Sequence, residues 1–317
     1  MQKSTILITG GTGYIGAHIG LLFAQKGFKV ILLDQSQPDC HYRWATTMKG
    51  NYGDSMILQS IFKNYTIDAI IHCAAFNTFK GTDSFDHYQY DLINTIKLLE
   101  QVRIYEIKKF IFTSCASVYG NNVGTIDHDA AKEPISSHGK STKMIETIVA
   151  DSANTQEFSY IILRPFCIAG GIPDQQIMYP ASSCNQTIAA IMESMITNKP
   201  FYYFDTDHQT PDGSIINDYA HVWDIARAHF AAYEYLGRHE KSDCFNIGSS
   251  RGISVKQLIE TTEKLFRKKI KTIAQKNTLA DSPCMIADIS KAIDLLNWQP
   301  SHSAIEFILK TAYKKLF

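Results

Sequence analysis

The chain has 317 residues, which exceeds the usual size of one small domain and predicts either two lobes or one large α/β unit. Lys and Arg together number 31, as do Asp and Glu, so the formal net charge is zero. This balance excludes the basic surface typical of nucleic-acid-binding and polybasic membrane-binding proteins. Seven cysteines with no Cys-x-x-Cys pair are typical of a reducing compartment, so we expect a soluble cytoplasmic protein without a zinc site.

The first half of the chain alternates short apolar runs with longer amphipathic stretches. The apolar runs predict strands covered on both faces, at residues 5–9, 29–34, 69–73, 110–114 and 160–164. Helical patterns lie between them, at residues 14–26, 55–65, 84–105 and 138–153. This alternation predicts right-handed βαβ units and therefore a Rossmann-type, doubly wound parallel sheet.

After Pro165 the sequence becomes richer in turn residues, and the helical patterns are more widely spaced. They fall at residues 187–197, 222–236, 255–264, 289–297 and 303–314. We therefore predict a Rossmann domain over residues 1–165 and a smaller α/β substrate-binding lobe over residues 166–317. Segments near residues 220–248 are expected to return to the first domain.

A glycine-rich turn follows the first predicted strand. Gly10, Gly13 and Gly16 would let the backbone turn tightly, approach a pyrophosphate and pack the next helix on the sheet. A glycine triplet alone is a weak signal, but here a strand precedes it and a helix follows it. Asp34 ends the second strand, where its carboxylate would accept hydrogen bonds from a ribose 2′-hydroxyl and repel a 2′-phosphate. The pattern predicts a dinucleotide site that favours NAD over NADP.

This segment resembles the cofactor loop of the extended short-chain dehydrogenase/reductases, in particular the NAD-dependent epimerase/dehydratase group that contains the UDP-glucose 4-epimerases. The resemblance extends over nearly the whole chain, through residues 10–16, 53–55, 67–75, 110–120, 218–224, 245–248, 287–291 and 296–298. It implies further cofactor contacts at Tyr14, Ile15, Asp54, Ser55, Cys73, Ala74, Ala75 and Phe166.

The residues at the family's catalytic positions depart from its pattern. The family uses a Tyr-x-x-x-Lys pair on one helix, and the matching segment has His138 and Thr142 at those two positions. Lys143 is one position too far along, about 140° around the helix from His138. The family's catalytic serine or threonine falls at Cys115, and nothing near it in the sequence would lower the pKa of its thiol. Cys115 is either a small buried residue or an altered catalytic group, and His138 is either a polar residue at the helix start or a general acid/base.

The positions that bind the nucleotide sugar in the family are also changed. The resemblance implies that relatives have an arginine where this chain has Asn217 and an asparagine where it has Cys167. Relatives also have an Arg-Arg-x-Gly-Asp segment at the place of residues 277–281, and often a lysine near the place of Asn77. Guanidinium groups are well suited to binding a diphosphate, and none stands at these positions. The loss of these residues indicates either relaxed selection on nucleotide-sugar binding or a different ligand.

Two further expectations concern assembly and metals. The predicted helices at 84–105 and 138–153 carry apolar residues on more than one face, and in the family these two helices form a four-helix dimer interface. A homodimer is therefore implied by the resemblance, with burial inside one chain as the alternative. The histidines at 208, 221 and 239 have no metal-ligand spacing, so no metal site is predicted.

Three functions fit these observations. The first is an NAD-binding relative of the nucleotide-sugar epimerases that has lost their standard catalysis. The second is an active NAD-dependent isomerase or oxidoreductase with a sugar-like substrate and His138 as acid/base. The third is an ordinary UDP-glucose 4-epimerase. The sequence does not identify the ligand.

Overall fold

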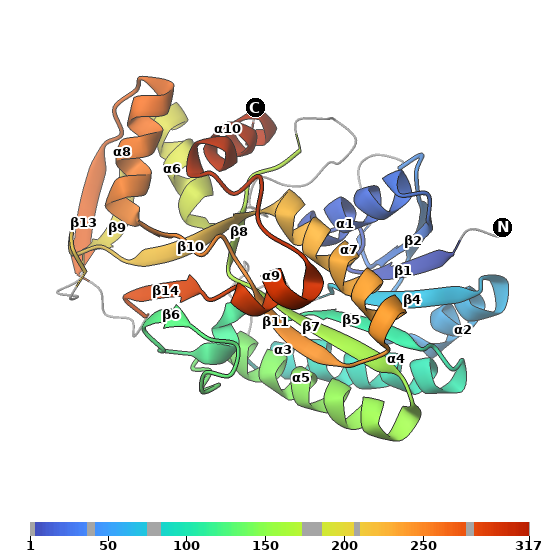
Figure 1. Cartoon of the computed structure of the whole chain (residues 1–317). Helices are drawn as coiled ribbons and strands as arrows, with labels where there is room; N and C mark the ends of the chain where they lie inside the picture. Colours follow the sequence, from blue (N-terminus) through green and yellow to red (C-terminus); the bar gives the residue numbers. More distant parts are fainter. Residues whose placement is uncertain are drawn as a thin grey trace.

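A computed structural model of the chain describes residues 4–36, 42–74, 84–172, 186–205, 210–276 and 282–316 (Figure 1). Its larger part is built on a seven-stranded sheet with the order β11-β7-β5-β4-β1-β2-β3, in which every neighbouring pair is parallel. The strands are β1 (Thr5–Thr9), β2 (Lys29–Asp34), β3 (Thr46–Lys49), β4 (Ile67–His72), β5 (Lys109–Thr113), β7 (Ser159–Pro165) and β11 (Asp243–Ile247). All five strands predicted from apolar runs lie in this sheet, which confirms the Rossmann-type fold.

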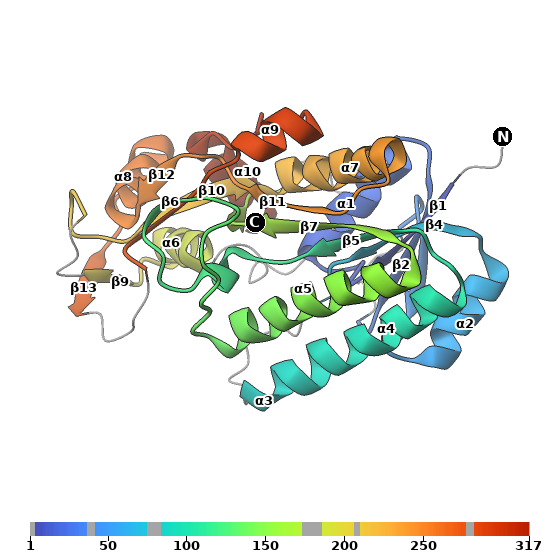
Figure 2. The ribbon, with the colours of Figure 1, turned by 60° about the horizontal axis from the view of Figure 1, so that its bottom comes forward.

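Alternating side chains of each central strand enter two different cores. Ile6 and Ile8 of β1 pack into one hydrophobic cluster, whereas Leu7 between them packs into the other. The first cluster lies under helices α1 (Tyr14–Gln25), α7 (Val222–His239) and α9 (Ser290–Leu296). The second lies under α2 (Ser55–Asn64), α4 (Ile93–Ile104) and α5 (Ser137–Gln156), on the opposite face of the sheet (Figure 2). Covering on both faces explains why these strands read as continuous apolar runs.

The helix predicted over residues 84–105 is interrupted near its start. It begins as α3 (Ser84–His87), continues as a π-helical turn, η2 (Tyr88–Leu92), and becomes regular in α4. Such π-helical turns are rare and occur frequently at functional sites. This turn places His87 and Asp91 in the buried interior.

The smaller lobe contains two further sheets. One joins β12 (Gly252–Ser254), β10 (Ile216–His221), β14 (Cys284–Ala287) and β6 (Gly124–Ile126), with β8 (Cys167–Ala169) also paired to β10; the other joins β9 (Phe201–Asp205) to β13 (Thr272–Lys276). The remaining helices are α6 (Gln186–Thr197), α8 (Val255–Phe266), α10 (Ile305–Leu316) and the 3₁₀ turn η3 (Ala116–Tyr119).

Strands cross between the two parts of the molecule in both directions. β11 lies beside β7 in the large sheet, although it comes from the second half of the chain. In return, β6 from the first half pairs with β14 in the smaller lobe. Each part therefore contains a strand from the other half of the sequence, and the boundary at residue 165 stays a prediction.

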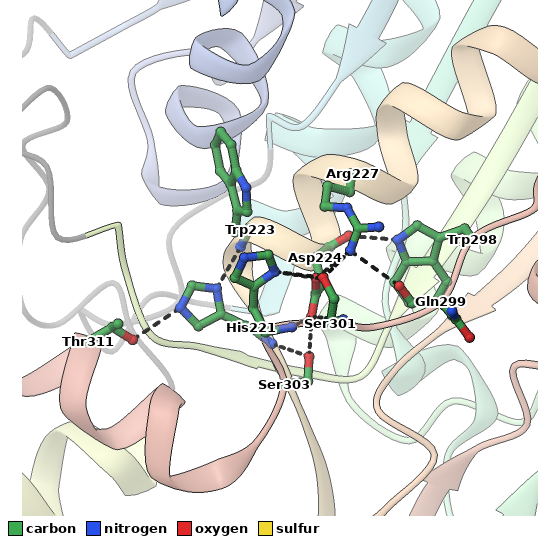
Figure 3. A network of polar contacts seen from close by, with 10 residues as sticks. His221, Trp223, Asp224, Arg227, Trp298, Gln299, Ser301, Ser303 and Thr311 are labelled. Carbon is green, nitrogen blue, oxygen red and sulfur yellow. Dashed lines mark hydrogen bonds and ion pairs between the residues drawn. The ribbon is translucent and has the colours of Figure 1, made fainter.

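A polar network at the start of α7 joins that helix to the segment that precedes α10 (Figure 3). The buried Asp224 carboxylate accepts hydrogen bonds from the backbone N–H groups of Ser301 and His302, at 3.0 and 2.7 Å, and from the Ser303 hydroxyl at 2.8 Å. His221 donates its backbone N–H to the Ser303 hydroxyl at 2.9 Å. These contacts fix the connection between the large sheet and the smaller lobe.

Within the described part of the chain, none of the helices combines the length and the apolar character needed to cross a membrane.

Candidate functional site

The glycine turn lies at the point where the order of the large sheet reverses, between β1 and β4. Gly10 has a φ of +65°, and a Cβ atom there would lie 2.7 Å from the Cα of Ala74 at the end of β4. A Cβ on Gly16 would lie 2.3 Å from the carbonyl oxygen of Gly10. Gly13 is the N-cap of α1 and supplies no side-chain cap to the first turn of that helix. The result is a tight cradle at a helix N-terminus, which fits the pyrophosphate of a dinucleotide.

The Asp34 side chain is held at the edge of this cradle. One carboxylate oxygen accepts the backbone N–H of Thr12 at 3.1 Å, and the other accepts the backbone N–H and hydroxyl of Ser36, at 3.1 and 2.9 Å. Asp34 ends β2, immediately beside the glycine turn. Its orientation is therefore fixed before any ligand arrives.

Several other predicted cofactor residues have clear roles in the fold. The Asp54 carboxylate caps α2, which begins at Ser55, by accepting the backbone N–H of Met56 at 2.9 Å. The Tyr14 hydroxyl donates to the carbonyl oxygen of Gly170 at 2.7 Å, which ties α1 to the end of β8.

The remaining predicted cofactor residues lie beside the cradle or on its flanks. Burial raises the pKa of the Cys73 thiol to about 12, so this cysteine is an unreactive neighbour of the cradle. Ile15 packs against the core under α1, and Phe166 is buried after β7. Ala75 lies outside the described residues.

Cys115 and His138, which occupy two of the family's catalytic positions, are in contact. Cys115 follows β5 and is the N-cap residue of η3, and His138 lies in the first turn of α5. The Cys115 Sγ and His138 Nε2 atoms are 3.4 Å apart. Burial raises the pKa of the thiol, but the hydrogen bond and positive charge of His138 outweigh it, so the pKa of Cys115 lies below its ordinary value. The sequence near Cys115 offers no such group, whereas the fold supplies one from a different element.

Thr142, at the family's lysine position, is buried on the inner side of α5. Lys143 is exposed, and its Nζ donates to the carbonyl oxygen of Lys132 at 2.6 Å. This agrees with the angular argument that Lys143 cannot replace a lysine at position 142. Neither residue places an ammonium group beside His138.

A buried ion pair behind Cys115 was not expected from the sequence. Arg164 at the end of β7 donates from Nε and Nη2 to the two carboxylate oxygens of Glu146 on α5, at 2.8 and 2.9 Å. Ser114, the residue before Cys115, donates its hydroxyl to the same carboxylate at 2.6 Å. The bidentate pair fixes α5 relative to β7 and, through Ser114, the backbone that carries Cys115. The signal that could have revealed it is a glutamate one turn after Thr142, on the face of α5 that must be buried.

A cavity of about 620 Å³ opens beside Cys115, between the large sheet and the smaller lobe. Aromatic side chains and small polar groups line it, among them Phe166, Phe201, Tyr203, Ser117, Cys167 and Asn217. None of the described residues lining it is a lysine or an arginine. The charged residue among them, Asp218, has its carboxylate occupied by the backbone N–H groups of Ser249, Ser250 and Ala287. The size suits a small organic molecule, and the described residues of the lining offer no cation to a diphosphate.

Comparison with known proteins places this architecture in a family. The model of the NAD dependent epimerase/dehydratase family matches residues 6–248. The chain belongs to this family. The UDP-glucose 4-epimerase of Halalkalibacterium halodurans is 31% identical over 315 residues, which cover 97% of this chain and 94% of that protein.

Solved structures of related enzymes share the fold over almost the full length. The UDP-glucose 4-epimerase from Brucella ovis, solved in complex with NAD, superposes with a TM-score of 0.92 at 26% identity, covering 99% of this chain and 98% of that one. The UDP-Glc/GlcNAc 4-epimerase from Campylobacter jejuni is 30% identical with a TM-score of 0.85, and 99% of each chain is covered. The resemblance found in the sequence motifs is therefore confirmed.

The fold brings together most of the predicted site. The glycine turn, Asp34, Cys73 and Ala74 meet at one edge of the sheet, and Cys115 and His138 meet beside the cavity. Asn217 and Cys167 line that cavity, whereas residues 76–77 and 277–281 lie outside the described part of the chain. The residues missed in the sequence are Glu146 and Arg164, together with His87 and Asp91, which lie close to His138.

Proposed function

We propose that this is a cytoplasmic NAD-binding protein that holds a nucleotide-sugar-like or other small ligand beside Cys115 and does not carry out standard epimerisation. The observation that carries the proposal is the contact between Cys115 and His138, together with the buried Thr142 and the exposed Lys143. The relay of the family is altered at all three of its positions. A general acid/base contributes typically about 10²–10⁴ to the rate, so its loss leaves little turnover.

The residues that would hold NAD are intact. Gly10, Gly13 and Gly16 would hold the pyrophosphate, and the Asp34 carboxylate, which accepts the Thr12 N–H beside this turn, would contact the adenosine ribose. Bound NAD would supply a hydride acceptor. The lack of an ammonium group at position 142 removes one expected contact with the nicotinamide ribose, so we expect weaker NAD binding than is usual for this fold.

The cofactor proposal is tested by titrating the purified protein with NAD and NADP. We expect NAD to bind more tightly, because the Asp34 carboxylate repels a 2′-phosphate. Asp34→Ala should shrink this preference, and Asp294→Ala, which removes an exposed carboxylate on α9, serves as the control. A preference for NADP in the unmodified protein would contradict the role given to Asp34.

The cavity lining indicates weak binding of UDP-hexoses. Each missing charge-assisted hydrogen bond costs about 1.5–3 kcal/mol, so the loss of two arginines would weaken binding by a factor of about 100 or more. Calorimetry with UDP-glucose measures this directly. A dissociation constant in the low micromolar range would show that other residues bind the diphosphate.

The catalytic proposal is tested by turnover. With saturating NAD at neutral pH, we expect no interconversion of UDP-glucose and UDP-galactose. His138→Tyr alone should restore little, because a phenol without a neighbouring cation keeps a pKa of about 10. Robust activity that survives His138→Ala would contradict this proposal and also the histidine mechanism described next.

A second candidate function is an active NAD-dependent isomerase or oxidoreductase that uses His138 as acid/base. The position of His138 in contact with Cys115, next to the cavity, favours it. The two candidates differ in one measurement. NADH formation with any member of a panel of sugars and nucleotide sugars, abolished by His138→Ala, would establish the second.

We also propose a homodimer formed through α4 and α5. These helices lie side by side on one face of the large sheet (Figure 2). Large apolar side chains remain exposed on and next to them, namely Phe85, Ile93, Ile96, Ile104 and Met144. Exposed apolar groups that gather on neighbouring helices are typical of a protein interface.

A further inference from the structure

Three potential metal ligands gather behind Cys115. His87 comes from α3, Asp91 from the π-helical turn η2 and His138 from the start of α5. Each offers one ligand atom, and these atoms lie within 4.8 Å of one another. His87 and Asp91 are almost fully buried, with 4% and 3% of their surface exposed.

The distances approach those of a tetrahedral zinc site. The His87 Nδ1 and Asp91 Oδ2 atoms are 3.3 Å apart. Zinc bonds to nitrogen and carboxylate oxygen of about 2.0–2.2 Å place two tetrahedral ligand atoms roughly 3.3–3.5 Å apart. The ring centroids of His87 and His138 are 5.7 Å apart, so a small inward movement of the imidazoles would complete the set.

One nitrogen of His138 has no partner in the described part of the chain. Its Nε2 atom contacts the Cys115 thiol. Its Nδ1 atom is buried and has no hydrogen-bond partner among the described residues. A buried polar atom without a partner is costly, and coordination of a metal ion would satisfy it.

We propose that His87, Asp91 and His138 bind one divalent transition-metal ion, with zinc as the ion that best fits two imidazoles and one carboxylate. His138 would coordinate through Nδ1, and its Nε2–H group would then donate to Cys115. Three protein ligands leave one tetrahedral position for water, as is usual in open zinc sites. The ion would fix the orientation of His138 and, through it, the position of the thiol beside the cavity.

The protein contains a second cluster of similar composition that provides a matched control. Asp127, His128 and Asp129 also lie within metal-binding distance of one another. The two carboxylates are solvent-exposed, and the two nitrogens of His128 contact different carboxylates, at 3.2 and 3.3 Å. We expect the solvated carboxylates of this cluster to contribute little to metal affinity.

The test uses the full chain without an affinity tag, treated with a chelator, dialysed and titrated with zinc chloride by calorimetry. We expect one zinc ion per chain. His87→Ala and Asp91→Asn should each weaken binding by about 100-fold or more, which exceeds the ~10–100-fold effect of losing an outer hydrogen bond. His128→Ala should leave the affinity unchanged.

Cobalt(II) substitution of the unmodified protein provides a measurement that does not depend on the folding of any variant. A tetrahedral absorption spectrum supports the site, and the spectrum of the hydrated ion overturns it. Absence of saturable zinc binding, or binding lost in His128→Ala but retained in His87→Ala and Asp91→Asn, also overturns the proposal. Zinc uptake requires neither NAD nor a sugar, so its outcome is separate from that of the proposed function.

Discussion

Two helical glycines differ in what a methyl group would meet, and this difference tests the cofactor cradle. A Cβ on Gly16 would lie 2.3 Å from the Gly10 carbonyl oxygen, whereas a Cβ on Gly237 in α7 meets nothing within 4 Å. We expect Gly16→Ala to abolish NAD binding and to lower the melting temperature, because backbone must move to relieve the contact. Gly237→Ala should instead stabilise the protein by about 0.5–1 kcal/mol, as alanine is the better helix former. Thermal unfolding and NAD titration of both variants provide the measurement, and unchanged NAD binding in Gly16→Ala would contradict the cradle.

The residues of the site were predictable where they follow a known motif. Gly10 and Asp34 are 24 positions apart, but both occupy fixed places in the strand-turn-helix-strand unit of a dinucleotide site. The contact of Cys115 with His138 joins two elements 23 positions apart, and no periodicity encodes it. Likewise, Glu146 and Arg164 are 18 positions apart, and only the packing of α5 on β7 brings them together as a buried pair.

The exposed face of α4 carries the proposed dimer interface. Ile93, Ile96 and Ile104 recur at helical spacing on this helix, and all three remain exposed. If the face is covered in a homodimer, Ile93→Lys places a charge in an apolar interface and should produce monomers. Met56→Lys, at an exposed apolar residue of α2, is the control and should leave the dimer intact. Light scattering coupled to gel filtration measures the mass, and a monomeric unmodified protein would refute the interface.

The start of α7 depends on one carboxylate. Both oxygens of Asp224 are used: one by Ser301, His302 and Ser303, the other by Arg227 at 3.0 Å (Figure 3). Burial raises the pKa of Asp224, but the hydrogen bonds from His302, Ser303 and Ser301 outweigh burial, so the pKa lies below its ordinary value. Asp224→Asn keeps only one acceptor oxygen, and we expect a loss of about 2–4 kcal/mol in the free energy of unfolding.

Urea denaturation measures the loss caused by Asp224→Asn. The matched control is Asp294→Asn on the exposed face of α9, which should change the free energy of unfolding by less than about 0.5 kcal/mol. Equal effects of the two substitutions would show that the network contributes nothing beyond a surface charge.

Secondary structure was predictable for the central strands of the large sheet and for most helices, but not for the strands of the smaller lobe. Each central strand buries both faces and so shows as an apolar run, and each long helix shows its period. The strands β6, β8 and β12 have only three residues each and pair with distant segments, such as β6 with β14. A three-residue strand is too short to show a periodic pattern of apolar residues, so its pairing with another strand determines its conformation.

For the whole molecule, three buried histidines make the free energy of unfolding depend on pH. His72 at the end of β4, His229 within α7 and His221 at the end of β10 are all almost fully buried. Burial lowers the pKa of His72 to about 3, and those of His229 and His221 to about 4. All three are therefore neutral in the folded protein at neutral pH, and each gains a proton more readily when the chain unfolds.

The sign of the resulting pH dependence follows from the depressed pKa values. Below the unfolded pKa of 6.5, the unfolded chain binds more protons than the folded one, so stability falls as the pH falls towards 4. One proton corresponds to about 1.4 kcal/mol per pH unit. His229 accepts the Thr113 hydroxyl at Nε2, at 2.8 Å, and its Nδ1 donates to the Ile225 carbonyl oxygen, also at 2.8 Å.

His229→Gln removes one of these titrations while keeping a donor and an acceptor in the core. We expect the slope of unfolding free energy against pH, measured by urea denaturation between about pH 6 and about pH 4.5, to decrease by about 1.4 kcal/mol per pH unit. The control is His239→Gln at the exposed end of the same helix, which should leave the slope unchanged. If His229→Gln shifts the whole curve downward without changing its slope, His229 contributes packing and hydrogen bonds but not the pH dependence.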